Sequence, residues 1–189
     1  MKTLFVIHGT YGNPNENWFP WLKNKLISKN IKVIIPKFPT PRGQTLDNWM
    51  KVFSKYSDYV DGNTVLVGHS TGAAFILNLL EVVNKKIDSA FLVSGYTGNI
   101  KSINEEDKKT LQLNEDITGR DFNWSKIRAN CSKFYIIHSD NDPHIPLKKA
   151  YELSKNLNTK ALILHNGGHF NSDAGYNEFP FLLDLILQK

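Results

Sequence analysis

Six short runs of apolar residues are the most regular feature of the sequence. They are rich in Val, Ile, Leu and Phe, and most are continuous rather than alternating with polar residues. Continuous apolar runs of this length are typical of strands that are covered on both faces, as in a parallel sheet. We therefore predict strands at residues 3–7, 32–35, 64–67, 89–93, 134–137 and 161–164.

Segments with helical periodicity fill most of the gaps between these runs. The first has apolar residues at i, i+3, i+4 and i+8, which are Trp18, Trp21, Leu22 and Leu26, behind the capping candidate Asn17. Further helices are predicted at residues 46–60 behind Thr45 or Asp47, at 73–83, around 150–157, and at 177–188 with Pro180 in the first turn and Phe181, Leu182, Leu185 and Ile186 facing inward.

The alternation of strands and helices predicts an α/β protein. We expect a three-layer sandwich of about six mainly parallel strands with helices on both faces, formed by a single domain over residues 1–189. The least regular segment is 96–123, which is polar and has only weak helical signal. A short lid and a loosely ordered surface loop both fit such a segment.

Composition narrows the class of protein. The net charge is +5, but the lysines are dispersed as pairs and singles, so we expect no nucleic-acid partner. The N-terminal apolar run is too short for a signal peptide, and no later segment could span a bilayer, so we expect a cytoplasmic protein without membrane insertion. The single cysteine, Cys131, precedes a predicted strand and is expected to be a buried or neutral thiol.

The segment Gly68-His69-Ser70-Thr71-Gly72 lies between the third predicted strand and the helix that follows it. The pattern G-x-S-x-G at a strand-to-helix junction is the nucleophile elbow of α/β-hydrolases. A turn this tight brings backbone against backbone, which residues without a Cβ allow. Ser70 is expected to hold an uncommon backbone conformation there. A purely structural turn is the alternative, and the strand and helix around the motif favour the elbow.

Three further segments with candidate chemistry follow predicted strands. His8-Gly9-Thr10 follows the first strand, the loop that contains Asp142 follows the fifth, and His169 follows the sixth. The carboxyl ends of parallel strands meet at one edge of a sheet, and the order Ser, Asp, His is the one that α/β-hydrolases use. We expect Ser70 to be the nucleophile, His169 its general base, and Asp142 the residue that orients His169.

Two assignments in this site depend on loop geometry. The oxyanion hole is expected to consist of the backbone N–H groups of Thr71 and of the loop after the first strand, for which Thr10 is the first choice. Asp140 competes with Asp142 for the third catalytic role, since both lie in one loop. We prefer Asp142 because Pro143 biases it toward an extended conformation.

The other histidines are expected to support the structure rather than react. His69 should pack or hydrogen-bond, His8 should support the oxyanion loop, His138 and His165 end strands, and His144 is a lesser candidate for the mouth of the site. The alternation of histidines and aspartates over 138–144 matches no EF-hand, H-E-x-x-H or C-x-x-C pattern, and no G-x-G-x-x-G follows the first strand. We expect no metal and no cofactor.

The sequence resembles the small serine hydrolases of the YdeN type, which also include the vertebrate retinoblastoma-binding serine hydrolase. The resemblance covers almost the whole chain and rests on the following residues: His8-Gly9-Thr10, Trp18 with Pro20-Trp21-Leu22, Phe38-Pro39 with Trp49, Gly68 to Gly72, Trp124 with Ile127, Ser139 to Pro143, and Gly167 to Asn171. It implies a reduced, nearly lidless α/β-hydrolase fold, activity on simple carboxylic esters, and a triad of Ser70, Asp142 and His169.

Two functional hypotheses follow. The first is a serine hydrolase, specifically a carboxylesterase whose substrate is a small or medium acyl ester cleaved through an acyl-enzyme. The alternative is a catalytically idle protein of the same fold that binds a protein partner through the cleft or through residues 96–123, although the sequence does not indicate such a partner. Plausible pocket aromatics are Tyr11, Trp18, Phe75, Tyr96 and Phe170, each of which fits the core equally well.

Overall fold

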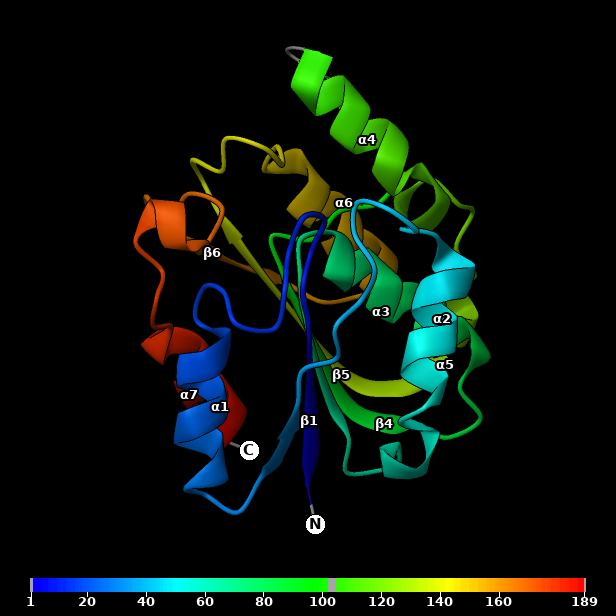
Figure 1. Ribbon diagram of the computed structural model, residues 1–189, viewed down its shortest axis with the longest axis vertical. Coiled ribbons are helices and arrows are strands. Elements are labelled where there is room, and N and C mark those ends of the chain that lie inside the picture. Colours follow the sequence, from blue (N-terminus) through cyan, green and yellow to red (C-terminus); the bar gives the residue numbers. More distant parts are fainter. Residues whose placement is uncertain (1, 102–104, 189) are drawn as a thin grey trace.

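The computed structural model describes residues 2–101 and 105–188. The predicted strands form one sheet in the order β2-β1-β3-β4-β5-β6, and every neighbouring pair is parallel (Figure 1). The predicted fold class, six mainly parallel strands with helices on both faces, is therefore confirmed. The strands are β1 (Thr3–Ile7), β2 (Lys32–Ile34), β3 (Val65–His69), β4 (Ile87–Val93), β5 (Cys131–Ser139) and β6 (Ala161–Leu164).

Helices cover both faces of the sheet because successive strand side chains point to opposite sides. Val65 and Val67 of β3 belong to the core beneath α1 and α7, while Leu66 belongs to the core beneath α2, α3, α5 and α6 (Figure 1). The helices are α1 (Phe19–Ile27), α2 (Leu46–Ser54), α3 (Thr71–Val82), α4 (Glu105–Thr118), α5 (Trp124–Ala129), α6 (Lys148–Leu157) and α7 (Pro180–Leu187).

The starts of two helices differ in how well they were predicted. Thr45, one of the two predicted caps of α2, accepts a hydrogen bond from the N–H of Asn48 (3.2 Å). The predicted cap of α1 is wrong. Asn17 has φ +50° and its Oδ1 accepts from the N–H of Ser172, while the buried Trp18 precedes the helix. Asn17 therefore joins two loops instead of capping the N-terminus of α1.

The C-terminus of α2 and the N-terminus of α7 differ from the predicted bounds. The chain leaves α2 after Ser54 and forms a short 3-10 turn at Ser57–Tyr59, so Val60 is buried beyond the helix rather than within it. The last helix begins at Pro180, where a missing N–H costs nothing, and not at residue 177. Leu182 and Ile186 face inward as predicted, but Phe181 is 39% exposed.

The segment 96–123 contains a helix where little regular structure was expected. α4 packs against α3 and stands beyond the edge at which the strands end (Figure 1). Its buried residues are Asn114, Ile117 and Thr118. The apolar periodicity is weak because most of the helix surface faces solvent. Residues 102–104 of this segment lie outside the described residues.

The start of β5 and the short helix α5 also differ from the prediction. The buried Cys131 was expected to precede a strand, and it is instead the first residue of β5. The short helix α5 was not predicted, because six residues are too few for a periodic pattern. Within the described residues, no helix has both the length and the apolar composition needed to cross a bilayer.

Candidate active site

Ser70 lies alone between the last residue of β3 and the first residue of α3. Its φ of +56° and ψ of −125° are uncommon for a residue with a side chain, as the motif predicted. The Ser70 N–H donates to the carbonyl of Val93, and the Ser70 carbonyl accepts from the N–H of Ala73. The turn is therefore fastened on both sides of the serine.

The two glycines of the motif allow the close backbone approach that this turn requires. A Cβ on Gly72 would lie 2.4 Å from the carbonyl oxygen of Ile7 and 2.6 Å from that of His8. A Cβ on Gly68 would lie 2.6 Å from the carbonyl oxygen of Gly72. Real Cβ atoms do not approach this closely, so α3 can start against the end of β1 only with glycine at both positions.

His169 and Asp142 form a buried pair at the carboxyl ends of β6 and β5. The His169 Nδ1 lies 2.8 Å from Asp142 Oδ2, and the Asp142 side chain is fully buried. Asp142 Oδ1 accepts from the N–H groups of His144 (2.9 Å) and Ile145 (3.0 Å). Burial alone would raise the pKa of Asp142, but His169 and these two amides outweigh it and lower the pKa to about 2.

The two candidate carboxylates have different partners. Asp140 contacts His165, whose Nδ1 lies 2.6 Å from Asp140 Oδ2 and whose side chain is 86% exposed. Asp142, and not Asp140, contacts His169. The loop that carries Asp142 is also fastened to the loop of His169, because Gly168 N–H donates to Asn141 Oδ1 (2.8 Å).

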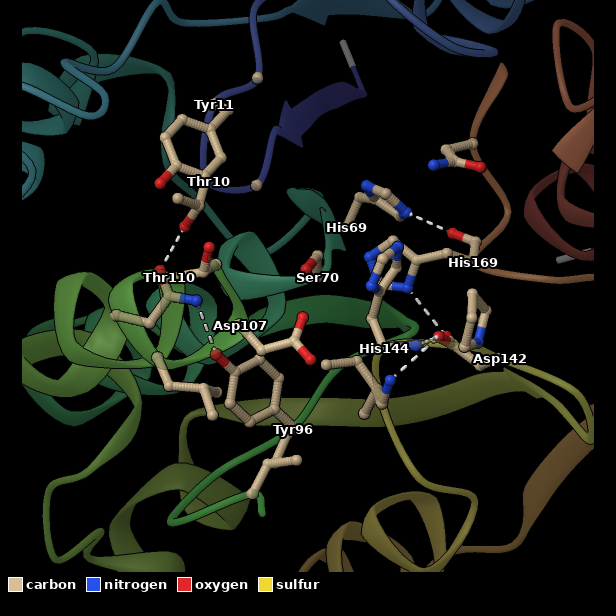
Figure 2. A pocket seen from close by; sticks show the side chains of 18 of the residues that line it. Thr10, Tyr11, His69, Ser70, Tyr96, Asp107, Thr110, Asp142, His144 and His169 are labelled. Atoms are coloured by element: carbon tan, nitrogen blue, oxygen red, sulfur yellow. Dashed lines mark hydrogen bonds and ion pairs between the residues drawn. The ribbon is translucent and has the colours of Figure 1, made fainter. Parts of the chain in front are cut away.

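A pocket of about 800 Å³ brings the candidate residues together. Ser70, Asp142 and His169 all line it, and so does Thr10 (Figure 2). In Figure 2, Ser70 lies between Thr10 and Tyr96 on one side and His169 on the other. The volume of the pocket is within the range of clefts that bind small molecules. Of the five candidate pocket aromatics, Tyr11 and Tyr96 line this pocket, whereas Trp18, Phe75 and Phe170 belong to the cores.

The loop after β1 commits two of its amides to internal partners. Tyr11 N–H donates to Thr40 Oγ1 (2.8 Å), and Gly12 N–H donates to the Gly9 carbonyl (3.2 Å). His8 fastens the start of this loop: its Nδ1 lies 2.8 Å from Gly9 O, and its Nε2 accepts from Phe38 N–H. Since Nε2 is an acceptor, the proton is on Nδ1. Burial lowers the pKa of His8 and keeps the ring neutral.

Two more histidines bind backbone carbonyls of the loops that carry the site. His69 Nε2 lies 2.8 Å from the His169 carbonyl, and His138 Nε2 lies 3.0 Å from the Ile145 carbonyl. Burial lowers the pKa of both rings, in His69 to about 3 with a further contribution from His169. The hydrogen-bonding role expected for His69 is confirmed. His144 lines the pocket and its ring lies edge-on to that of His169.

The sequence did not single out Gln44 and Asn114, which are buried beside Thr10. Each is a polar residue in a segment without clear periodicity, so no local signal marked it. Within the described part of the chain, no group of three or more His, Cys, Asp or Glu side chains is arranged to hold a metal ion.

Known proteins resemble this chain over nearly its whole length. A family model described as serine hydrolase matches residues 4–188. The YdeN protein of Bacillus subtilis (strain 168) is 29% identical over 187 residues, which cover 98% of this chain and 94% of that protein. The serine hydrolase RBBP9 of Rattus norvegicus is 26% identical over 172 residues, which cover 90% and 85%. The crystal structure of the B. subtilis ydeN gene product matches with a TM-score of 0.90 and 28% identity, covering 100% of this chain and 98% of that one.

Proposed function

The chain belongs to the serine hydrolase family, and from this membership we propose that it is a carboxylesterase that cleaves small or medium acyl esters through Ser70, His169 and Asp142. The family resemblance stated from the sequence motifs is thereby confirmed, and with it the assignment as a hydrolase. The ester substrate and the catalytic roles of the three residues go beyond family membership and are our proposal. The arrangement that carries this proposal is the buried Asp142–His169 pair in the same pocket as the strained Ser70.

The proposed reaction has two steps. Ser70 Oγ attacks the ester carbonyl carbon, and His169 Nε2 takes the hydroxyl proton, since Nδ1 faces Asp142. The tetrahedral intermediate collapses to an acyl-enzyme, and His169 gives the proton to the departing alkoxide, which leaves as the alcohol. Water then attacks the acyl carbon, with His169 as the base, and Ser70 recovers its proton as the acid leaves.

Backbone amides stabilise the negative charge that forms on the carbonyl oxygen. Thr71 is the first residue of α3, so its N–H has no partner within the helix and lies at the positive end of the helix dipole. In the loop after β1, the amides of Tyr11 and Gly12 are already committed. This supports Thr10 N–H as the second donor of the oxyanion hole.

The pocket supports a substrate of modest size. Its walls include the side chains of Ile100, Leu111 and Ile145, which suit an acyl chain, and the half-exposed Tyr11. We expect the highest kcat/KM within the p-nitrophenyl ester series at acetate to hexanoate, with a decline at longer chains.

Labelling with a fluorophosphonate probe, followed by peptide mapping, tests the nucleophile. We expect the wild type to be labelled on Ser70, and Ser70→Ala and His169→Ala to be unlabelled. Ser172→Ala is the matched control, because Ser172 also lines the pocket but is exposed and outside the proposed triad. It should be labelled like the wild type.

Two results would overturn the proposal. One is full esterase activity in Ser70→Ala. The other is a folded wild type that is neither labelled nor able to turn over any acyl ester. In that case the idle binding protein becomes the better hypothesis, and equal partner affinity of wild type and Ser70→Ala would support it.

A further inference from the structure

A buried cluster of polar side chains joins α4 to the loop after β1. Asn114 of α4 is 3% exposed and Gln44 is 5% exposed. The Thr10 hydroxyl donates to Asn114 Oδ1, and Gln44 Nε2 donates to Thr10 Oγ1 (2.9 Å) and to Asn114 Oδ1 (2.8 Å). Gln44 and Asn114 therefore both hydrogen-bond to the same threonine and to each other.

The cluster also reaches the second proposed oxyanion residue. Thr10 Oγ1 lies 3.0 Å from Thr71 Oγ1, and Asn114 Nδ2 donates to the Tyr96 hydroxyl (2.7 Å). Tyr96 and Thr71 are both buried. In Figure 2, Thr10 and Tyr96 lie on the side of Ser70 away from His169. The side chains of both proposed oxyanion donors thus belong to one hydrogen-bonded cluster.

A second connection holds the residue that follows Thr10. Gln44 Oε1 accepts from the Thr40 hydroxyl (2.6 Å), and Thr40 Oγ1 accepts from the Tyr11 N–H (2.8 Å). The backbone around Thr10 is therefore constrained through its own side chain and through the next amide. Loss of one partner would leave buried groups unpaired and let the loop shift.

We propose that Asn114 and Gln44 are positioning residues that aim the N–H groups of Thr10 and Thr71 at the substrate oxygen. This rests on the proposed function, because the oxyanion hole is part of it. Both residues act through Thr10. When an oxyanion-hole donor is displaced by a fraction of an ångström, the transition state loses more stabilisation than the bound substrate does. Their loss should therefore lower kcat and leave KM nearly unchanged.

A structural role for Asn114 alone, in docking α4, predicts a different result. Asn78 of α3 is a buried asparagine that also anchors α4, since its Nδ2 donates to the carbonyl of Ile117 (2.8 Å), but neither hydrogen bond of this Nδ2 involves Thr10. Asn78→Leu is therefore the matched control for Asn114→Leu. If docking of α4 were all that mattered, the two variants would behave alike.

The experiment measures p-nitrophenyl butyrate kinetics and the ¹H–¹⁵N amide signals of Thr10 and Thr71. We expect Asn114→Leu and Gln44→Met to lower kcat about 10- to 100-fold while KM changes less than about threefold. The two amide signals should move in both variants and stay in place in Asn78→Leu. Asn114→Asp, which keeps the acceptor for Thr10 and Gln44, should be closer to wild type in kcat than Asn114→Leu.

The outcomes separate this inference from the function on which it rests. Unmoved amide signals and an unchanged kcat in Asn114→Leu would overturn it. Moved amide signals and a lowered kcat in Asn78→Leu would overturn it as well. If Asn114→Leu does not fold, Gln44→Met decides. A wild type without esterase activity or probe labelling would overturn the proposed function, and the amide signals would still decide whether Asn114 and Gln44 position the loop.

Discussion

The imidazole Nε2 of His69 lies 2.8 Å from the backbone carbonyl oxygen of His169. Because a carbonyl only accepts, this nitrogen carries the proton of a neutral ring. The residue beside the proposed nucleophile therefore holds the backbone of the proposed base. The G-x-S-x-G motif and the loop after β6 are joined by a bond that does not depend on the triad side chains.

His69 makes the stability of the protein depend on pH. Burial lowers its pKa from 6.5 to about 3. Between pH 6.5 and pH 3, His69 is therefore protonated in the unfolded chain and neutral in the native state. The free energy of unfolding then falls as the pH is lowered, by up to about 1.4 kcal/mol per pH unit from this group. His69→Gln keeps an N–H donor for the His169 carbonyl but does not titrate. Its stability should fall less steeply between pH 6.5 and 3.

Denaturant unfolding at a series of pH values measures this slope. His8 and His138 also have lowered pKa values and act in the same direction, so the difference between the variant and the wild type is the informative quantity. Identical slopes in the two proteins would mean that His69 binds a proton as readily in the native state as in the unfolded chain.

The two aspartates of the loop after β5 should differ sharply in their importance for catalysis. Asp142 holds His169 Nδ1, whereas Asp140 holds the exposed His165. Asp142→Asn removes the charge that stabilises the imidazolium and should lower kcat by about 10³–10⁴. Asp140→Asn should remain within about threefold of the wild type, because an exposed pair contributes little. Steady-state kinetics on one ester measures both, and a larger loss in Asp140→Asn would reverse the assignment.

Ser70, the proposed nucleophile, should reduce the stability of the protein. Its φ of +56° costs a residue with a Cβ about 1–2 kcal/mol, which glycine avoids. We expect Ser70→Gly to be about 1 kcal/mol more stable than Ser70→Ala, after allowance for the more flexible unfolded chain. Both variants lack the hydroxyl and should be inactive. Equal unfolding free energies would show that the turn carries no strain.

Gly72 should tolerate no side chain. The Cβ of alanine would collide with the carbonyl oxygens of Ile7 and His8, and both belong to the backbone at the end of β1. We expect Gly72→Ala to lower the free energy of unfolding by about 3 kcal/mol or more. Gly62→Ala is the control, since its Cβ would have only one neighbour, at 3.8 Å. Thermal unfolding of the two variants checks this, and a Gly72→Ala protein as stable as Gly62→Ala would contradict it.

Local patterns were sufficient for the sheet and the elbow. Continuous apolar runs identified the six strands of the sheet. The strands β1 and β3 are buried on both faces, and the edge strands β2 and β6, although only partly buried, are still mostly apolar in sequence. The elbow was readable because its glycines are required by contacts within a few residues of Ser70 and with the adjacent β1. Helix α4 could not be predicted from the sequence, because it buries only a narrow face and its residues are mostly polar.

The composition of the candidate site depended on tertiary structure. Asp140 and Asp142 are chemically alike and two residues apart, so the path of the loop, held by the amides of His144 and Ile145, decides which one meets His169. Asn114 and Gln44 are 70 residues apart, and only the packing of α4 against α3 makes them neighbours. By itself the sequence determined the segments that must be buried. Which polar groups meet was decided by the folded chain, because hydrogen bonds depend on distances that no local pattern encodes.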